Sequence, residues 1–114
     1  MSYFVRTTRR FESEVKRLLK KYPSLSKEVF QLIHSLELNP TQGIPLGQGC
    51  YKLRLSIKSK GKGKSGGARV ITYVHVTNKS VDLLTIYDKS EQDSIQIAAL
   101  KQLLTELDQN YNIH

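Results

Sequence analysis

The sequence predicts an α+β fold in which an N-terminal helical hairpin packs on a small antiparallel sheet with a C-terminal helix. Two hydrophobic patterns predict it. Apolar residues recur at every third or fourth position in two stretches near the N-terminus and one near the C-terminus, and between these stretches they alternate with polar residues. The chain has 114 residues, 39% of them hydrophobic, which suits one domain, residues 1–114, with its own core.

The N-terminal part predicts a short strand, residues 3–5, and then two helices. From residue 8 the apolar side chains follow the helical period: Phe11, Val15, Leu18, Leu19 and Tyr22. Pro23 ends this helix because proline disfavours helical geometry in the residue before it. A second apolar stripe consists of Leu25, Val29, Leu32, Ile33 and Leu36. This second helix ends before Pro40, and the short connection between the two predicts an antiparallel hairpin.

The central part predicts three antiparallel strands, and a helix follows them. Residues 41–49 are rich in glycine and proline and predict turns. Residues 50–58 alternate apolar and cationic side chains, residues 68–77 form the next strand, and residues 81–87 follow a tight turn. Residues 90–93 resemble a capping box, which predicts that the last helix begins there.

The positive charge is concentrated in the middle of the chain. The sequence has 18 basic and 10 acidic residues, a formal charge of +8. No acidic residue lies between Glu37 and Asp82, and that segment contains eight basic ones: Lys52, Arg54, Lys58, Lys60, Lys62, Lys64, Arg69 and Lys79. A basic segment of this kind favours a polyanionic partner, nucleic acid above all. The alternative is a solvated surface that keeps the protein soluble.

Strand alternation predicts a cationic face on the sheet. If the strands align, one surface carries Lys52, Arg54, Lys58, Arg69 and Tyr73. Guanidinium groups bind phosphates and tyrosine rings stack on bases, so this face suits RNA. It is equally compatible with the polar, solvent-facing side of an ordinary antiparallel sheet. Period two also places Tyr87 on the same face as Leu83 and Thr85.

Residues 59–67, SKGKGKSGG, combine four glycines with three lysines. Glycines let backbone N–H groups approach phosphates, and the lysines add charge. The segment lacks the GxxxxGK[ST] spacing of a nucleotide-binding P-loop. It is as compatible with a basic linker as with a binding loop.

Other chemistry finds little support in the sequence. The three histidines lie far apart and no HExxH or CxxC spacing occurs, so we expect no metal site and no cofactor. Cys50 is the only cysteine, which excludes an internal disulfide and suits a buried small hydrophobe better than a nucleophile. No apolar run approaches the roughly 20 residues that cross a bilayer. The N-terminus also lacks the apolar segment of a signal peptide, so a cytoplasmic location is expected.

Three stretches resemble one family: Lys52-Leu53-Arg54, SKGKGKSGGARVITYV and LLTIYDKSE. They are similar to the RelE/ParE superfamily of type II toxins, within it to the HigB-like group, and the resemblance covers nearly the whole chain. It implies a metal-independent endoribonuclease that enters the ribosomal A site and cuts mRNA, thereby inhibiting translation. The implied partners are the ribosome and its rRNA, mRNA and a cognate antitoxin of the HigA/RelB-like kind, with no membrane involved.

The resemblance also implies roles for particular residues. Catalytic or phosphate-clamping roles are implied for Lys52, Arg54, Arg69, Tyr87 and Lys89. RNA contacts are expected for Lys58, Lys60, Lys62, Lys64 and Tyr73. Metal-free RNA cleavage proceeds by attack of the 2′-hydroxyl on the adjacent phosphate, which needs a base, an acid and cations. A lysine among other cations has a lowered pKa and is a candidate base.

This chain departs from the family pattern at two places. Many relatives have glycine where this chain has Asp88, whose carboxylate would act as a base or weaken RNA binding. The C-terminal residues 111–114 do not offer the active-site tyrosine or histidine that some members have there, so the general base stays unassigned.

Two other functions stay open on the sequence. A ParE-like toxin of the same fold would inhibit gyrase and cut no RNA, and a third possibility is a non-catalytic RNA-binding module. The antitoxin is expected to cover either the basic face or the apolar helical hairpin, and the sequence does not choose between these surfaces.

Overall fold

The computed structural model describes residues 2–60, 66–92 and 94–111. The described chain forms a five-stranded sheet in the order β1-β5-β4-β3-β2. The strands are β1 (Phe4–Thr7), β2 (Ile44–Gly47), β3 (Cys50–Leu55), β4 (Ala68–His75) and β5 (Ser80–Asp88). Only β1 pairs in parallel, with β5, and all other neighbours are antiparallel.

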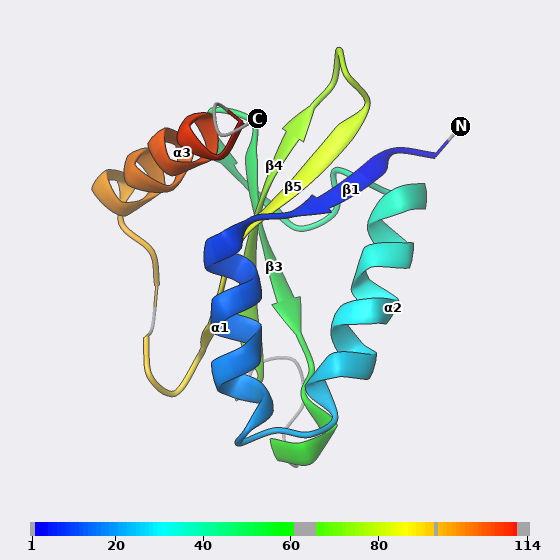
Figure 1. Cartoon of the computed structure of the whole chain (residues 1–114), viewed down its shortest axis with the longest axis vertical. Helices are drawn as coiled ribbons and strands as arrows, with labels where there is room; N and C mark the ends of the chain where they lie inside the picture. Colours follow the sequence, from blue (N-terminus) through cyan, green and yellow to red (C-terminus); the bar gives the residue numbers. More distant parts are fainter. Residues whose placement is uncertain (1, 61–65, 93, 112–114) are drawn as a thin grey trace.

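Helices cover both faces of this sheet (Figure 1). Helix α1 (Arg9–Leu19) and helix α2 (Leu25–Leu38) run antiparallel over one face, and α3 (Ile97–Tyr111) lies over the other. The side chain of Thr8 caps α1 by accepting a hydrogen bond from the Phe11 amide at 3.2 Å. A short 3₁₀ helix, η1 (Lys58–Lys60), follows β3. The predicted α+β fold with an N-terminal helical hairpin is therefore confirmed.

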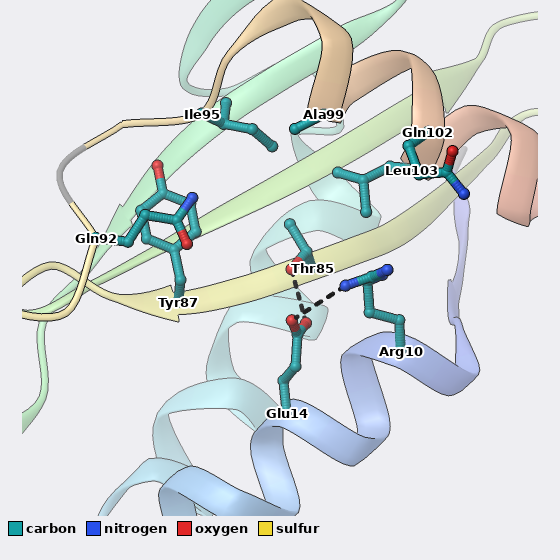
Figure 2. Close-up of a pocket in the computed structure, with 9 residues that line it drawn as sticks. All are labelled: Arg10, Glu14, Thr85, Tyr87, Gln92, Ile95, Ala99, Gln102 and Leu103. Carbon is teal, nitrogen blue, oxygen red and sulfur yellow. Dashed lines mark hydrogen bonds and ion pairs between the residues drawn. The ribbon is translucent and has the colours of Figure 1, made fainter.

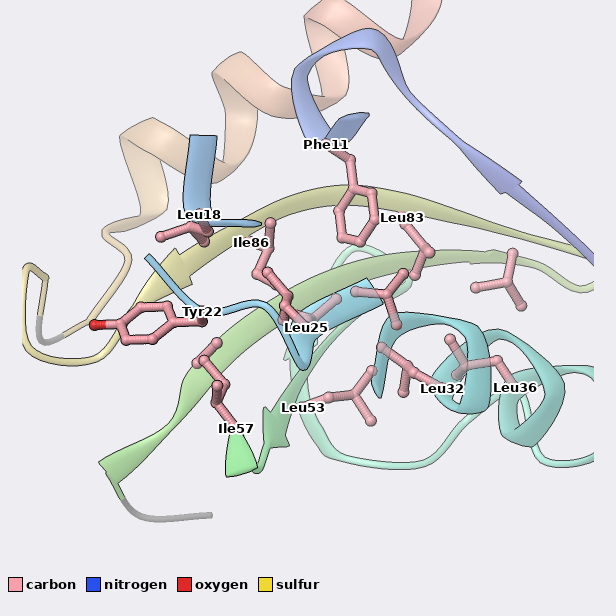
Figure 3. Close-up of a cluster of buried hydrophobic side chains, with 14 of the residues drawn as sticks. Phe11, Leu18, Tyr22, Leu25, Leu32, Leu36, Leu53, Ile57, Leu83 and Ile86 are labelled. Atoms are coloured by element: carbon pink, nitrogen blue, oxygen red, sulfur yellow. The ribbon is translucent and has the colours of Figure 1, made fainter. Parts of the chain in front are cut away.

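The larger core lies between the sheet and the helical hairpin (Figure 3). Its fully buried members include Phe11, Leu18, Leu25, Leu36, Leu83 and Ile86. The smaller core lies under α3 and contains Cys50, Ile71, Leu84, Tyr87, Leu100, Leu103 and Leu107. Cys50 is buried, as expected of a small hydrophobe, and burial raises the pKa of its thiol to about 11.

A β-bulge in β5 changes which side chains share a face. Ile71 pairs with Thr85 and Thr72 pairs with Leu83, so Leu84 has no partner of its own on β4. Leu83 consequently packs on the hairpin side, and Tyr87 lies on the α3 side. The prediction that Leu83 and Tyr87 share a face was wrong because strict alternation does not hold across a bulge.

Three predicted boundaries also differ from the structure. Residues 44–47, predicted as turns, form the edge strand β2, where Pro45 is tolerated because edge strands leave some N–H groups unpaired. The strand expected to reach residue 58 ends at Leu55 and gives way to η1. Helix α3 begins at Ile97, because residues 88–92 form a turn in which the Glu91 and Gln92 amides donate to the Asp88 carbonyl. Within the described residues, no helix is long and apolar enough to span a membrane.

Candidate nucleic-acid interface

A row of three predicted site residues crosses the sheet. Arg54 on β3 pairs directly with Arg69 on β4, and Arg69 pairs directly with Tyr87 on β5. Directly opposed residues on antiparallel strands project to the same face with Cβ atoms roughly 4.5–5.5 Å apart. The expected alignment of Arg54 with Arg69 is confirmed, and the pairing adds Tyr87 to the same face. We call these three residues the Arg-Arg-Tyr row.

The row is accessible at one end and buried at the other. Arg54 is exposed, and it makes no ion pair with any residue in the described part of the chain. Arg69 and Tyr87 are only 5% and 6% exposed. One guanidinium nitrogen of Arg69 donates to the carbonyl oxygen of Ala68 at 3.1 Å. Within the row, Arg54 is therefore exposed to solvent, whereas Arg69 and Tyr87 are buried.

Like charges on directly opposed strand residues are destabilising. Arg54 and Arg69 are directly opposed cations, and an anion bound between their guanidinium groups would attract both. Arginine binds phosphate with two parallel N–H···O bonds, which makes a phosphodiester a suitable anion for this position. The geometry supports the sequence-based expectation that this face binds a polyanion.

A pocket of about 230 Å³ opens beside Tyr87, between α1, β5 and α3 (Figure 2). Its lining mixes charged, polar and apolar side chains: Arg10, Glu14, Thr85, Tyr87, Gln92, Ile95, Ala99, Gln102 and Leu103. Gln92, Ala99 and Gln102 are exposed, so solvent reaches the pocket past their side chains. The pocket therefore borders the buried, tyrosine end of the row.

Glu14 provides the carboxylate of this pocket, and the sequence analysis did not identify it. One carboxylate oxygen accepts hydrogen bonds from the Thr85 hydroxyl at 2.7 Å and from the Ile86 amide at 3.1 Å. Burial raises the pKa of Glu14, although these hydrogen bonds and nearby Arg10 act in the opposite direction. The helical period held a signal, because Glu14 lies three residues after Phe11 and four before Leu18, on the buried face of α1.

The other predicted site residues surround the row at different depths. Lys52 is half-buried on β3, where it pairs with Ile71. It lies on the same face as Arg54, two residues earlier in the strand. Tyr73 is half-buried further along β4, with its ring edge-on to His75 at 4.3 Å between centroids. Lys89 follows β5 directly and is half-buried. Lys52 and Tyr73 thus lie on strands that also carry the row, and Lys89 directly follows the strand of Tyr87.

Of the predicted RNA-binding lysines after β3, the two that the structure describes, Lys58 and Lys60, do not continue the cationic face of the sheet. Lys58 is exposed, but it lies in η1 and not on a strand. Lys62 and Lys64 lie outside the described residues. The Lys60 side chain is 8% exposed, and its ammonium group contacts a carboxylate oxygen of Asp88 at 2.5 Å. Because its charge is paired inside the protein, we do not propose Lys60 as an RNA contact.

Asp88 is fully buried and lies on the hairpin side of the sheet, away from the Arg-Arg-Tyr row. One oxygen accepts a hydrogen bond from the Tyr22 hydroxyl at 2.6 Å. The other oxygen accepts from Lys60 and from the backbone amide and hydroxyl of Ser90, at 2.9 and 2.7 Å. Burial alone would raise the pKa of Asp88, but the hydrogen bonds from Lys60, Tyr22 and Ser90 hold it well below its usual range. The carboxylate is thus ionised and enclosed, and it adds no exposed negative charge beside the row.

We find no cluster of three or more histidine, cysteine, aspartate or glutamate side chains suited to a metal ion among residues 2–60, 66–92 and 94–111. The functional groups that the row and the pocket bring together are guanidinium, phenol, carboxyl and amide groups.

Comparison with solved structures relates the fold of this chain to that of known toxins. The toxin RelE of E. coli, in a free-state variant with two arginines changed to alanine, matches 82% of this chain and 90% of its own length (16% identity, TM-score 0.60). The toxin–antitoxin complex RelBE2 of Mycobacterium tuberculosis matches 77% and 99% (19% identity, TM-score 0.60). Isolated E. coli RelE matches 93% and 99% (14% identity, TM-score 0.56).

The chain has the RelE fold. No family model matches the sequence, so the RelE likeness rests on three-dimensional structure alone. At these identities it extends to the RelE fold and not to a subgroup such as the HigB-like toxins.

Proposed function

We propose that this RelE-fold chain is the toxin of a type II toxin–antitoxin system and cleaves mRNA in the ribosomal A site without a metal ion. The observation that carries the proposal is the Arg-Arg-Tyr row, two arginines and a tyrosine on adjacent strands of a RelE-like sheet. The LLTIY strand and the glycine- and lysine-rich residues 59–67 favour the HigB-like group within this fold. A cytoplasmic location and a cognate antitoxin are part of the same proposal.

The row suits in-line cleavage of a phosphodiester by the 2′-hydroxyl. Arg54 and Arg69 would bind the non-bridging phosphate oxygens, whose negative charge increases as the pentacovalent transition state forms. Tyr87 would orient the nucleotide, which reaches it through the pocket between α1, β5 and α3. Lys52 and Lys89, half-buried near the row, are the candidates for the two proton transfers: one lysine, as a neutral amine, would take the proton of the 2′-hydroxyl, and the other, as an ammonium group, would give a proton to the leaving 5′-oxygen.

The proposal is tested by primer extension on an mRNA that is being translated in vitro, with the purified wild type and an Arg54→Ala variant. Arg54 is the exposed member of the row, so its removal should leave the fold intact. We expect loss of roughly 10²–10³-fold in cleavage rate, as for removal of one transition-state donor. Arg9→Ala, which removes an exposed arginine from α1, is the matched control and should cleave like the wild type.

The outcomes separate the candidate functions. Equal cleavage by wild type and Arg54→Ala would remove the row from the active site. A wild type that cuts no RNA but blocks DNA supercoiling by gyrase would establish the ParE-like alternative. A wild type that binds ribosomes without cutting mRNA would establish a non-catalytic RNA-binding module.

A further inference from the structure

Four exposed lysines lie at the end of the helical hairpin that adjoins the end of β3. Lys20 and Lys21 directly follow α1, Lys27 lies in the first turn of α2, and Lys58 is the first residue of η1. Figure 1 shows the connection between α1 and α2 at the end of the molecule where β3 ends. We call these four lysines the hairpin-end patch.

Hydrogen bonds join the segments that carry the patch. Ser24, in the connection between α1 and α2, and Ser59, in η1, exchange two hydrogen bonds at 2.8 and 3.0 Å, each backbone amide donating to the other side-chain oxygen. The Lys58 amide donates to a carboxylate oxygen of Glu28, the residue after Lys27, at 2.7 Å. The lysines of η1 and of the hairpin therefore belong to one surface.

The negative charges in this region are enclosed by the chain. Glu28 is 8% exposed, and its second carboxylate oxygen accepts from the Ser24 hydroxyl at 3.1 Å. Asp88 is fully buried and paired with Lys60. The four exposed lysines of the patch therefore outnumber Glu28, whose carboxylate makes no ion pair in the described part of the chain.

Other charges of the hairpin are balanced, whereas those of the patch are not. Arg10 pairs with Glu106, and Arg17 pairs with Glu91. None of the four patch lysines makes an ion pair with a described residue. The sequence outside the basic central segment has equal numbers of basic and acidic residues, and this balance hides a local excess of positive charge at the end of the hairpin.

Exposed lysines without acidic partners suit the phosphate backbone of a nucleic acid. Lysine binds phosphate as a point charge, and it is depleted in protein–protein interfaces. The patch also adjoins the Arg-Arg-Tyr row, because Lys58 follows Arg54 by four residues and their Cα atoms are at most about 14 Å apart. An RNA strand with one phosphate at Arg54 can therefore reach Lys58 within a few nucleotides.

We propose that the hairpin-end patch is a second RNA-binding surface, which binds backbone phosphates beside the strand held at the Arg-Arg-Tyr row. The proposal rests on the function proposed above and extends RNA binding to three lysines outside the basic central segment: Lys20, Lys21 and Lys27. Contacts to phosphates carry no sequence information, so the patch adds affinity for ribosome-bound RNA without selecting a codon. Lys58, which does not continue the cationic face of the sheet, belongs to this second surface.

The test measures how binding to ribosomes depends on salt when the patch loses its charge. Three lysines are changed together in the variant Lys20→Gln/Lys27→Gln/Lys58→Gln. All three are exposed, so the fold should stay intact. Lys21 is left unchanged because its ammonium group lies 5.5 Å from the centre of the Tyr22 ring, a contact that contributes to packing.

A second triple variant, Arg9→Gln/Lys79→Gln/Lys101→Gln, is the matched control. It removes the same net charge from three exposed residues that lie elsewhere, at the start of α1, in the turn between β4 and β5, and on α3. Both triple variants are made in an Arg54→Ala background, in which mRNA is expected to stay largely intact while binding is measured. Any difference between them then reports on the position of the lost charges and not on their number.

Dissociation constants are measured between about 50 and 200 mM salt, with ribosomes programmed with mRNA, with ribosomes that lack mRNA, and with free mRNA. For the patch variant we expect binding to programmed ribosomes that is about tenfold weaker than for the control. The slope of log affinity against log salt should be smaller by about 2–3, since each lost phosphate contact removes about 0.7–0.9. Equal weakening with and without mRNA would identify the phosphates as those of rRNA, and weakening only when mRNA is present would identify them as those of mRNA.

Equal affinity and equal salt slope for the two triple variants would overturn the proposal. Weaker binding by the patch variant with an unchanged slope would overturn it as well, because the lost contacts would not be electrostatic. A patch variant that binds ribosomes like the control but loses affinity for poly-L-glutamate would assign the patch to an acidic polypeptide instead.

The binding test is independent of cleavage. A wild type that binds ribosomes but cuts no mRNA would refute the proposed nuclease, and the salt slopes of the two triple variants would still decide whether the patch binds RNA.

Discussion

At the scale of single residues, the Tyr22–Asp88 contact has a direct consequence for titration. The hydrogen bond to the buried Asp88 carboxylate, together with burial, raises the pKa of the Tyr22 phenol to about 12. The folded state therefore binds this proton more tightly than the unfolded chain, whose tyrosines titrate near pH 10. The stability that results is fully present below about pH 10 and is lost as the pH rises towards 12.

We predict that a spectrophotometric titration of the folded protein shows a late tyrosinate step near pH 12 that is missing in Tyr22→Phe. The chain has six tyrosines, so Tyr51→Phe is a suitable control: it removes a phenol that has no contact with Asp88, and the late step should remain. Persistence of the late step in Tyr22→Phe would contradict the assignment of the hydrogen bond.

Whether the face or the partner of a side chain can be predicted depends on how far apart along the chain the interacting residues lie. The alternation of side chains within each strand was enough to predict the face on which Arg54 and Arg69 lie. The pairing of Lys60 with Asp88 joins positions 28 residues apart through η1, where strand alternation has already ended. No local pattern signals such a contact, and Lys60 was therefore grouped with the exposed lysines.

At the scale of elements, α1 supports the bulge of β5 through Glu14. Strand β1 ends at Thr7, opposite Leu83, so the Ile86 amide lies beyond the reach of the parallel ladder. The Glu14 carboxylate accepts from this amide and from Thr85. The bulge that turns Tyr87 towards α3 is thus held by a side chain from a different layer of the fold.

We predict opposite effects for two substitutions of Glu14. Glu14→Ala leaves the buried Ile86 amide without an acceptor and should lower the free energy of unfolding by about 1–3 kcal/mol. Glu14→Gln keeps an acceptor oxygen and removes the ionisable group. Because the pKa of Glu14 is raised on folding, ionised Glu14 disfavours the folded state, so the stability of Glu14→Gln relative to wild type should increase as the pH rises from 4 to 7.

Denaturant titrations at several pH values measure both effects, with Ser13→Ala on the exposed face of α1 as a control expected to stay within about 0.5 kcal/mol. A stability difference between Glu14→Gln and wild type that does not change with pH would contradict the account of Glu14.

The elements themselves were predictable where a periodic pattern is long. Helices α1 and α2 and strands β4 and β5 follow from apolar periodicity. Strand β2 was missed because its four residues include proline and glycine, which are typical of turns. It forms the edge of the sheet, where it pairs with β3. The start of α3 was placed too early because Ser90 donates its hydrogen bonds to Asp88, where a helix cap had been expected.

At the scale of the whole molecule, the two faces of the mixed sheet carry different groups of residues. The hairpin side contains the larger core and the Asp88 network, and the α3 side contains the Arg-Arg-Tyr row and its pocket. The parallel pairing of β1 with β5 joins residues more than 70 positions apart, and nothing in the local sequence predicts it. The fold class could therefore be predicted from sequence, whereas the strand order and the layer that each site residue faces required the structure.

The most direct test of the central claim maps where the purified protein cuts RNA. Ribosomes are stalled on a defined mRNA with an empty A site, and the wild-type protein is added to these complexes and, separately, to the same mRNA without ribosomes. We predict cleavage within the A-site codon on the ribosome, a 2′,3′-cyclic or 3′-phosphate at the new end, and no cleavage of the free mRNA. Intact mRNA on the ribosome, or the same cuts in free mRNA, would contradict the proposal.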